Sequence, residues 1–437
     1  MHSGRGHWAS RVGFVLAAAG SAIGLGNIWK FPYITGEYGG GAFVLVYLGC
    51  IAVVGMPIML AELLLGKLSQ RDPVGAFREL EHSRSGWQLV GWLGVASAFV
   101  ILSFYSVVAG WALAFFARSV MGVIAAGADP AMIGGLFSEL YANPTEQIVW
   151  HAIFMGVTIA IVSGGVHKGI ERWSDILMPA LLMMLLGLFI YALTLDAARD
   201  GARFLFAADF SKLTPDAVLE ALGHSFFTLS LGMGAMITYG SYLGRDANLV
   251  RAGTWIVILD TVIALLAGMV IFPIVFQFGM EPGAGPGLIF KTLPLAFIQM
   301  TGGQLVACVF FLLLSFAALT SAISLLEVAV AFFHDEVGLD RKVAAGGIGG
   351  IIFLLGVPSA LYGSFFDFMD QISTNYMLPI GGLGIAIYTG WVLDRARAEG
   401  GLGPGVSAGL IAAWLQVLRF VTPVLVLIVF LHKIGVF

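Results

Sequence analysis

Charged side chains are scarce in this sequence. Aspartate, glutamate, lysine and arginine make up 11% of its 437 residues, whereas apolar residues make up 59%. Soluble domains carry about 25% charged residues, so the composition argues against an ordinary soluble protein and indicates a membrane protein. The formal net charge of −4 gives no support to a nucleic-acid partner.

Two further scarcities narrow the possible functions. The chain has two cysteines, Cys50 and Cys308, both inside apolar runs, which disfavours a disulfide framework and favours packing roles. The sequence contains no HExxH, GxSxG or Walker A motif, and GLGNIW lacks the third glycine and the preceding strand of a dinucleotide fingerprint. An enzyme is therefore the least favoured class.

Long apolar runs, by contrast, fill the chain. A bilayer core needs about 20 apolar residues per helix. We therefore expect an all-α membrane protein with eleven transmembrane helices, at about residues 11–35, 40–67, 88–121, 147–164, 171–195, 217–241, 252–279, 304–335, 343–360, 369–394 and 407–432. The N-terminal segment lacks the features of a cleaved signal peptide, so we expect the first helix to be retained.

The distribution of basic residues predicts the orientation. Most of the 22 lysines and arginines fall in segments that would face the cytoplasm if the N-terminus did so. Cytoplasmic loops near helix ends collect these residues. We expect a multi-pass membrane protein with its N-terminus in the cytoplasm and its C-terminus outside.

Glycine is abundant, with 58 residues, and it interrupts two of the predicted spans. The stretch GSAIGLGNIWKFP, residues 20–32, lies in the first span, and HSFFTLSLGMGAMITYGSY, residues 224–242, lies in the sixth. These spans occupy matching positions if the first ten helices form two five-helix halves of opposite orientation. Glycine-interrupted helices at matching places in two halves indicate a central transport site.

Each break needs a polar occupant, because unpaired backbone groups in lipid cost several kcal/mol each. N–H groups at a half-helix N-terminus suit a carboxylate, and free carbonyls suit a cation. Two adjacent breaks therefore suit a zwitterion together with hard cations such as sodium. The hydroxyl and amide side chains available at membrane depth are Asn27, Thr228, Ser230, Thr320 and Ser321.

Plainer interpretations stay open for single features. GSAIG is a GxxxG pattern, so Gly20 and Gly24 also suit close helix packing. Thr320 and Ser321 also suit bonds to carbonyls of their own helix. Asp260, within WIVILDTVIALL, is harder to explain by packing, because carboxylates inside a membrane are costly and usually functional.

With both breaks placed, the chain resembles the neurotransmitter:sodium symporter family, in particular its bacterial amino-acid transporters. The resemblance rests on GLGNIWKFP followed by GGGAF, SFFTLSLGMG and LTSAIS, in that order, and spans essentially the whole chain. It implies an inverted repeat of five plus five helices with broken helices 1 and 6. We expect one transporter domain over residues 1–435, with repeats at about 8–195 and 217–396 and an extra helix at about 407–432.

Motif by motif, the resemblance implies the residues of three binding sites. The first sodium site would use the substrate carboxylate with Ala22, Asn27, Thr228 and Asp260. The second would use carbonyls and hydroxyls of Gly20, Ile23, Ala317, Thr320 and Ser321. The substrate would lie among Ala22, Gly24, Leu25, Gly26, Ile101, Tyr105, Phe227, Thr228, Ser230, Met233, Ser321 and Leu325.

The resemblance also implies two gates. Tyr105 and Phe227 would form an aromatic lid over the substrate, with Lys30 and Asp370 as an outer ion pair. On the inner side the path would be closed by Arg5, Asp335, Trp8 and Tyr242.

Departures within the family indicate the ligand. Gly24 stands where carriers of amines without a carboxylate have an aspartate, which implies an amino-acid substrate. The apolar Ile101, Met233 and Leu325 favour a neutral hydrophobic or aromatic side chain. Asp260 stands where chloride-dependent members have asparagine, so the resemblance implies two sodium sites and no need for chloride.

The function expected is sodium-coupled symport of neutral L-amino acids by alternating access, with a monomer sufficient for transport. Two alternatives remain: a proton-coupled amino-acid transporter of the same fold, and an amino-acid sensor that does not translocate its ligand. Flux measurements distinguish them.

Overall fold

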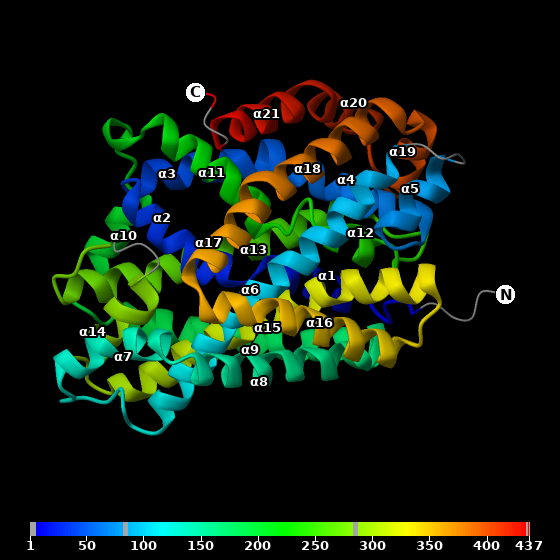
Figure 1. Cartoon of the computed structure of the whole chain (residues 1–437). Coiled ribbons are helices and arrows are strands. Elements are labelled where there is room, and N and C mark those ends of the chain that lie inside the picture. The colour runs from blue at the N-terminus through cyan, green and yellow to red at the C-terminus, as the bar shows by residue number, and fades with distance from the viewer. Residues whose placement is uncertain (1–5, 82–85, 283–286, 434–435, 437) are drawn as a thin grey trace.

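The computed structural model describes residues 6–81, 86–282, 287–433 and 436, and Arg5 lies outside these residues. Every regular element within the described ranges is helical. This agrees with the predicted all-α fold. Figure 1 shows the helices gathered into a bundle, with α20 and α21 along one side and α8 along the opposite side.

The predicted spans correspond to long helices or to runs of helices, several of which contain a π-helical segment. In chain order the spans are α1 Arg11–Ala22 with Gly26–Lys30 and α2 Phe31–Glu37; α3 Gly41–Cys50 with Ile51–Gly55 and α4 Met56–Ser69; α6 Gln88–Val120; α8 Pro144–Ser163; Val166–Glu171 with α9 Arg172–Ala192; α11 Pro215–Thr228 and α12 Ala235–Gly240; α13 Leu249–Gln277; α15 Gly303–Val337; α16 Arg341–Leu361; α17 Gly363–Gln371 with Ile372–Met377, α18 Leu378–Ile387 and Tyr388–Val392; and α20 Ala408–Gln416 with Val417–Val421 and α21 Thr422–Lys433.

Eight described helices are each long and apolar enough to cross a bilayer, and two bent pairs raise the number to ten. The interrupted α11 and α12 would supply one more span, so the total of eleven stays a prediction. The fourth span illustrates how a boundary is set. Asn143 accepts a hydrogen bond from the Glu146 amide at 3.2 Å and Pro144 occupies the first turn of α8. This is a common helix start.

Shorter helices connect the spans: α5 Pro73–Glu81, α7 Pro130–Ala142, α10 Ala198–Phe206, α14 Leu293–Phe297 and α19 Arg395–Gly401. The most buried spans are α6 and α15, which pack against each other at the centre of the bundle. The span ending in α21 and the span containing α9 expose the most apolar surface, as expected for helices that face lipid.

Both predicted breaks are present. The first span bends by 49° between α1 and Gly26–Glu37, where Ile23 leaves the helical conformation. Between α11 and α12 the chain is irregular, with positive φ at Gly232 (78°) and Gly234 (74°). Glycine adopts this conformation without a steric penalty. The two glycine-rich motifs therefore interrupt their helices inside the bundle.

Candidate functional site

The two breaks are joined by direct hydrogen bonds. The Ser230 hydroxyl donates to the carbonyl of Ser21 at 2.8 Å, and Ser230 has a φ of 54°, unusual for a residue other than glycine. From α4, the buried Glu62 accepts a hydrogen bond from the Gly232 amide at 2.7 Å. Sequence reasoning missed Glu62, although a lone glutamate in an apolar run was a signal for it.

The residues predicted for the first sodium site converge. Asp260, fully buried on α13, accepts hydrogen bonds through Oδ1 from Asn27 Nδ2 at 2.8 Å and from Thr228 Oγ1 at 3.0 Å. The Gly24 amide donates to Asn27 Oδ1 at 3.2 Å. Asp260 Oδ2 has no hydrogen-bond partner among the described residues. A buried carboxylate oxygen with amide and hydroxyl oxygens around it fits a hard cation.

The residues predicted for the second sodium site also lie together, between α1 and α15. Thr320 Oγ1 is 3.0 Å from the Ala317 carbonyl and 3.4 Å from the Ile23 carbonyl. Ser321 Oγ lies 3.5 Å from the Gly20 carbonyl and 3.1 Å from that of Ser21. The two hydroxyls thus face three carbonyls at the end of α1 and the Ala317 carbonyl on α15. These neutral oxygens suit a monovalent cation better than a metal that needs His, Cys or carboxylate ligands.

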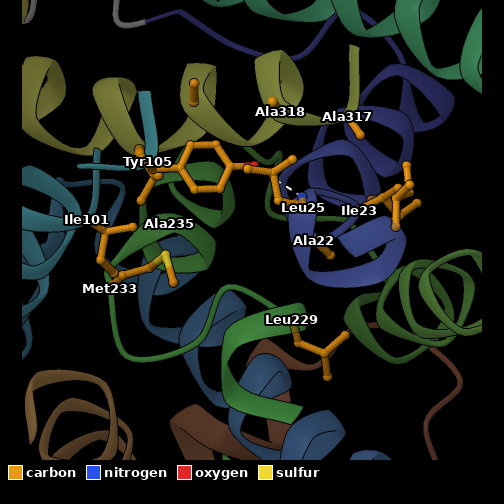
Figure 2. Close-up of a cluster of buried hydrophobic side chains, with 14 of the residues drawn as sticks. Ala22, Ile23, Leu25, Ile101, Tyr105, Leu229, Met233, Ala235, Ala317 and Ala318 are labelled. Carbon is orange, nitrogen blue, oxygen red and sulfur yellow. Dashed lines mark hydrogen bonds between the residues drawn. The ribbon is translucent and has the colours of Figure 1, made fainter. Parts of the chain in front are cut away.

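A small cavity of about 20 Å³ lies between the two breaks. Its walls contain every residue predicted for the substrate site except Thr228, which turns toward Asp260. Ser21 lines it as well and was not predicted. In Figure 2, Tyr105 reaches from α6 to Leu25, and Ile101 and Met233 lie side by side. The dashed line is the hydrogen bond that the Leu25 amide donates to the Tyr105 hydroxyl, at 3.2 Å.

Gly24 leaves space that a larger residue would fill. A Cβ atom at this position would lie 2.4 Å from Ser321 Oγ and 2.9 Å from the Tyr105 hydroxyl. Both hydroxyls face the central cavity, so the absence of a side chain at Gly24 keeps them close to the break.

A second cavity, the vestibule, has a volume of about 380 Å³ and is lined in part by Phe137 and Tyr141 of α7. Leu25, Tyr105 and Phe227 line both cavities. The role of Tyr105 and Phe227 as a lid stays a prediction.

The outer ion pair differs from the prediction. Lys30 and Asp370 both line the vestibule, but Lys30 Nζ lies 3.5 Å from Glu220 on α11. Asp370 Oδ1 instead accepts a hydrogen bond from Thr374 at 3.1 Å. Glu220 was not predicted from the sequence, although it lies two helical turns before Phe227 and so on the same face of α11.

Near the start of α1, buried polar contacts include two of the predicted inner-gate residues. Trp8 Nε1 donates to the Tyr239 carbonyl at 3.0 Å, and the Tyr242 hydroxyl donates to Glu327 at 2.6 Å. Arg341 forms an ion pair with Glu327, which is fully buried on α15 and was not predicted.

Asp335 was expected to close the inner path with Arg5. It lines a cavity of about 210 Å³ together with Tyr242 and Arg341. The pairing with Arg5 itself lies outside the described residues.

The fold and the paired breaks define a class of protein: a membrane transporter of the inverted-repeat type. Comparison with known proteins identifies the family. The family model described as "Sodium:neurotransmitter symporter family" matches residues 5–127 and 143–437. The chain belongs to this family of sodium-dependent transporters.

Individual relatives cover nearly the whole chain. An uncharacterized sodium-dependent transporter of Bacillus subtilis is 40% identical, with 98% of both chains covered. A second, from Haemophilus influenzae, is 35% identical with the same coverage. Among solved structures, the crystal structure of MhsT in complex with L-phenylalanine matches with a TM-score of 0.90 and 47% identity, covering 98% of this chain and 100% of MhsT. The 5+5 inverted-repeat fold is thereby confirmed.

Proposed function

We propose that this protein carries neutral hydrophobic or aromatic L-amino acids across the membrane together with sodium and without chloride. The observation that carries the proposal is the position of Asp260. Its buried carboxylate binds Asn27 and Thr228 directly beside the cavity between the two helix breaks.

The substrate carboxylate would bind at the break in the first span. Leu25 and Gly26 line the cavity near the start of a half-helix, and its N–H groups suit an anion. The Leu25 amide, which now donates to the Tyr105 hydroxyl, would donate to the carboxylate, and Tyr105 would add a second hydrogen bond. Because Gly24 supplies no charge of its own, the substrate would bring the carboxylate that completes the first sodium site.

Coupling follows from this shared group. Sodium at Asn27, Thr228 and Asp260 would attract the carboxylate, and the carboxylate would complete the ligands of the ion. Each therefore raises the affinity for the other, as linked binding requires. The second ion, at Thr320 and Ser321, would hold α1 against α15.

The amino-acid side chain would lie against Ile101, Met233 and Leu325, which offer it no charge. The bound L-phenylalanine in MhsT, which is 47% identical, supports a hydrophobic substrate. Methionine adapts to ligands of several shapes, so we expect a range from leucine-like to aromatic amino acids.

Chloride independence is supported by charge balance. Two sodium ions and a zwitterion bring net positive charge into a low-dielectric site, and a nearby carboxylate compensates part of it. Asp260 provides that carboxylate permanently. We further propose that the protein works as a monomer in a bacterial inner membrane with its N-terminus in the cytoplasm.

Uptake into liposomes tests the proposal. The purified protein is reconstituted, and accumulation of labelled leucine, phenylalanine, glutamate and lysine is followed under an inward sodium gradient. Replacing sodium by potassium should abolish uptake, and replacing chloride by gluconate should leave it unchanged. Uptake driven by a proton gradient in potassium would contradict the proposal, and binding without accumulation would show a sensor instead.

A further inference from the structure

A groove on the surface of the bundle lies between α1 and the first half of α13, and it shares no lining residue with the cavity between the two breaks. Its volume is about 540 Å³. Three of its lining residues are polar: Arg11, Asn248 and Arg251. All three stand at the starts of their helices, since α1 begins at Arg11 and α13 begins at Leu249. The groove therefore has one polar end.

The rest of the groove is apolar and runs along both helices. On α1 its wall continues through Val15 and Leu16, and on α13 it reaches Leu259. A helix rises about 1.5 Å per residue, so Leu259 lies about 12 Å farther along α13 than Arg251. The polar end suits a phospholipid headgroup, and an apolar channel of this length suits an acyl chain.

The groove faces outward. Val12 is 67% exposed and Trp255 is 51% exposed. Exposed apolar side chains on membrane-spanning helices contact lipid, and tryptophan is enriched at the level of the headgroups. The polar end thus lies where the headgroups of the leaflet on the N-terminal side begin.

The charge at this end is positive. Arg11 forms an exposed ion pair of 2.9 Å with Asp246. The Arg251 side chain is exposed, and within the described part of the chain it makes no hydrogen bond or ion pair. Guanidinium groups bind phosphate through parallel hydrogen bonds. Because Asp246 pairs with Arg11 and not with Arg251, the Arg251 guanidinium is available to an anion.

We propose that this groove binds an anionic phospholipid of the leaflet on the N-terminal side. The phosphate lies at Arg251 and Arg11, and one acyl chain lies along Leu16 and Leu259. Because the lipid contacts both α1 and α13, it holds the inner half of the first span against the seventh. Uncharged and zwitterionic lipids lack the net negative charge and bind less tightly.

Native mass spectrometry of the full-length protein in detergent tests this proposal. Delipidated protein is incubated with phosphatidylglycerol, or with phosphatidylcholine carrying the same acyl chains, and retained lipid and thermal unfolding are measured. We expect preferential retention of phosphatidylglycerol and a rise in unfolding temperature. The double variant Arg11→Gln with Arg251→Gln should retain about tenfold less, because charge-assisted hydrogen bonds are lost.

Three controls make the outcome decisive. Arg172→Gln removes an exposed arginine at the start of α9 that does not line the groove, and should retain lipid as the wild type does. Ala252→Phe fills the apolar channel with both arginines intact, and should reduce retention. Glycerol phosphate without acyl chains should not stabilise the protein. Equal losses in Arg172→Gln and the double variant, equal retention of both lipids, or stabilisation by glycerol phosphate alone would overturn the proposal.

Discussion

Ser230 and Ser21 connect the two broken helices directly: the Ser230 hydroxyl donates to the Ser21 carbonyl at 2.8 Å. The bond spans 209 residues of sequence and joins break to break, next to the cavity that both residues line. The Ser321 hydroxyl of α15 donates to the same carbonyl at 3.1 Å, so two side chains satisfy the backbone at the end of α1. The two halves of the repeat are thereby positioned relative to each other at the central site.

Two substitutions of Ser230 distinguish the contribution of its hydroxyl from that of its positive φ. We expect Ser230→Gly to keep the positive φ and lose the hydrogen bond. A loss of about 0.5–1.5 kcal/mol at the substrate site corresponds to a roughly twofold to twelvefold loss of substrate affinity. Ser230→Ala should be worse, because alanine is strained at this φ. Equilibrium binding of labelled substrate and thermal unfolding measure both effects, and equal results for the two variants would contradict the backbone part.

Gly24→Ala should abolish high-affinity substrate binding. The added Cβ would lie 2.4 Å from Ser321 Oγ and 2.9 Å from the Tyr105 hydroxyl, so one or both hydroxyls must move away from the break. Gly49→Ala on α3 is the matched control, because nothing lies within 4 Å of its Cβ position. Binding of labelled substrate to both variants in detergent checks the prediction, which fails if Gly24→Ala binds like the wild type.

Asp260→Asn should make transport depend on chloride. The variant keeps an amide oxygen toward Asn27 and Thr228 but loses the permanent negative charge of the first sodium site. We expect a loss of sodium-driven uptake in gluconate, by at least about tenfold, with partial recovery in chloride. Asp367→Asn, in the wall of the vestibule, controls for removal of a carboxylate elsewhere and should remain chloride-independent. Normal uptake by Asp260→Asn in gluconate would contradict the charge-compensation proposal.

The outer ion pair provides a further test. Because Lys30 lies 3.5 Å from Glu220, Glu220→Gln should weaken substrate retention more than Asp370→Asn does. Both side chains of the pair are partly exposed, so we expect an effect of about 0.5–1 kcal/mol, or two- to fivefold in the dissociation rate of labelled substrate. The exchanged pair Lys30→Glu with Glu220→Lys should recover part of the loss, and a larger effect of Asp370→Asn would instead favour the original prediction.

Residues within the glycine-rich motifs could be predicted from the sequence, whereas their distant partners could not. Asn27, Thr228 and Ser321 lie in short motifs whose interruption of a helix is visible in the sequence. Glu62 and Glu327 are single carboxylates in apolar runs. Such a residue indicates a function, but its partner depends on how distant helices pack. Glu62, for example, accepts a hydrogen bond from Gly232, which is 170 residues away in the sequence.

Distances between side chains around one cavity could not be predicted from the sequence either. Asp370 and Glu220 both belong to segments near the vestibule, and only the structure shows that Glu220 is the closer to Lys30. The span boundaries were predicted well because charge, proline and capping residues mark them. The fifth and tenth spans are exceptions: the fifth begins at Val166, five residues before the predicted start at residue 171, and the tenth begins at Gly363, six residues before the predicted start at residue 369.

The connection between α4 and α5 should make stability depend on pH. Asp72 is buried there and caps α5 by accepting hydrogen bonds through Oδ1 from the Val74 and Gly75 amides, at 2.9 and 3.2 Å. Burial, the largest cause, together with the nearby Glu336 and Asp335 raises the pKa of Asp72 from 3.8 to about 7, although the two amides lower it.

A raised pKa means that the folded state binds the proton more tightly than the unfolded state. Stability contributed by Asp72 is therefore lost as the pH rises from about 4 to about 7. Asp72→Asn keeps an acceptor for the cap and has no charge to bury, so its unfolding temperature should exceed that of the wild type by a few degrees at about pH 8 and by less at about pH 5. Asp129→Asn, at the exposed cap of α7, should show no such growth of the difference with pH. A difference between Asp72→Asn and wild type that stays constant with pH would show that Asp72 is charged at little cost in the folded protein.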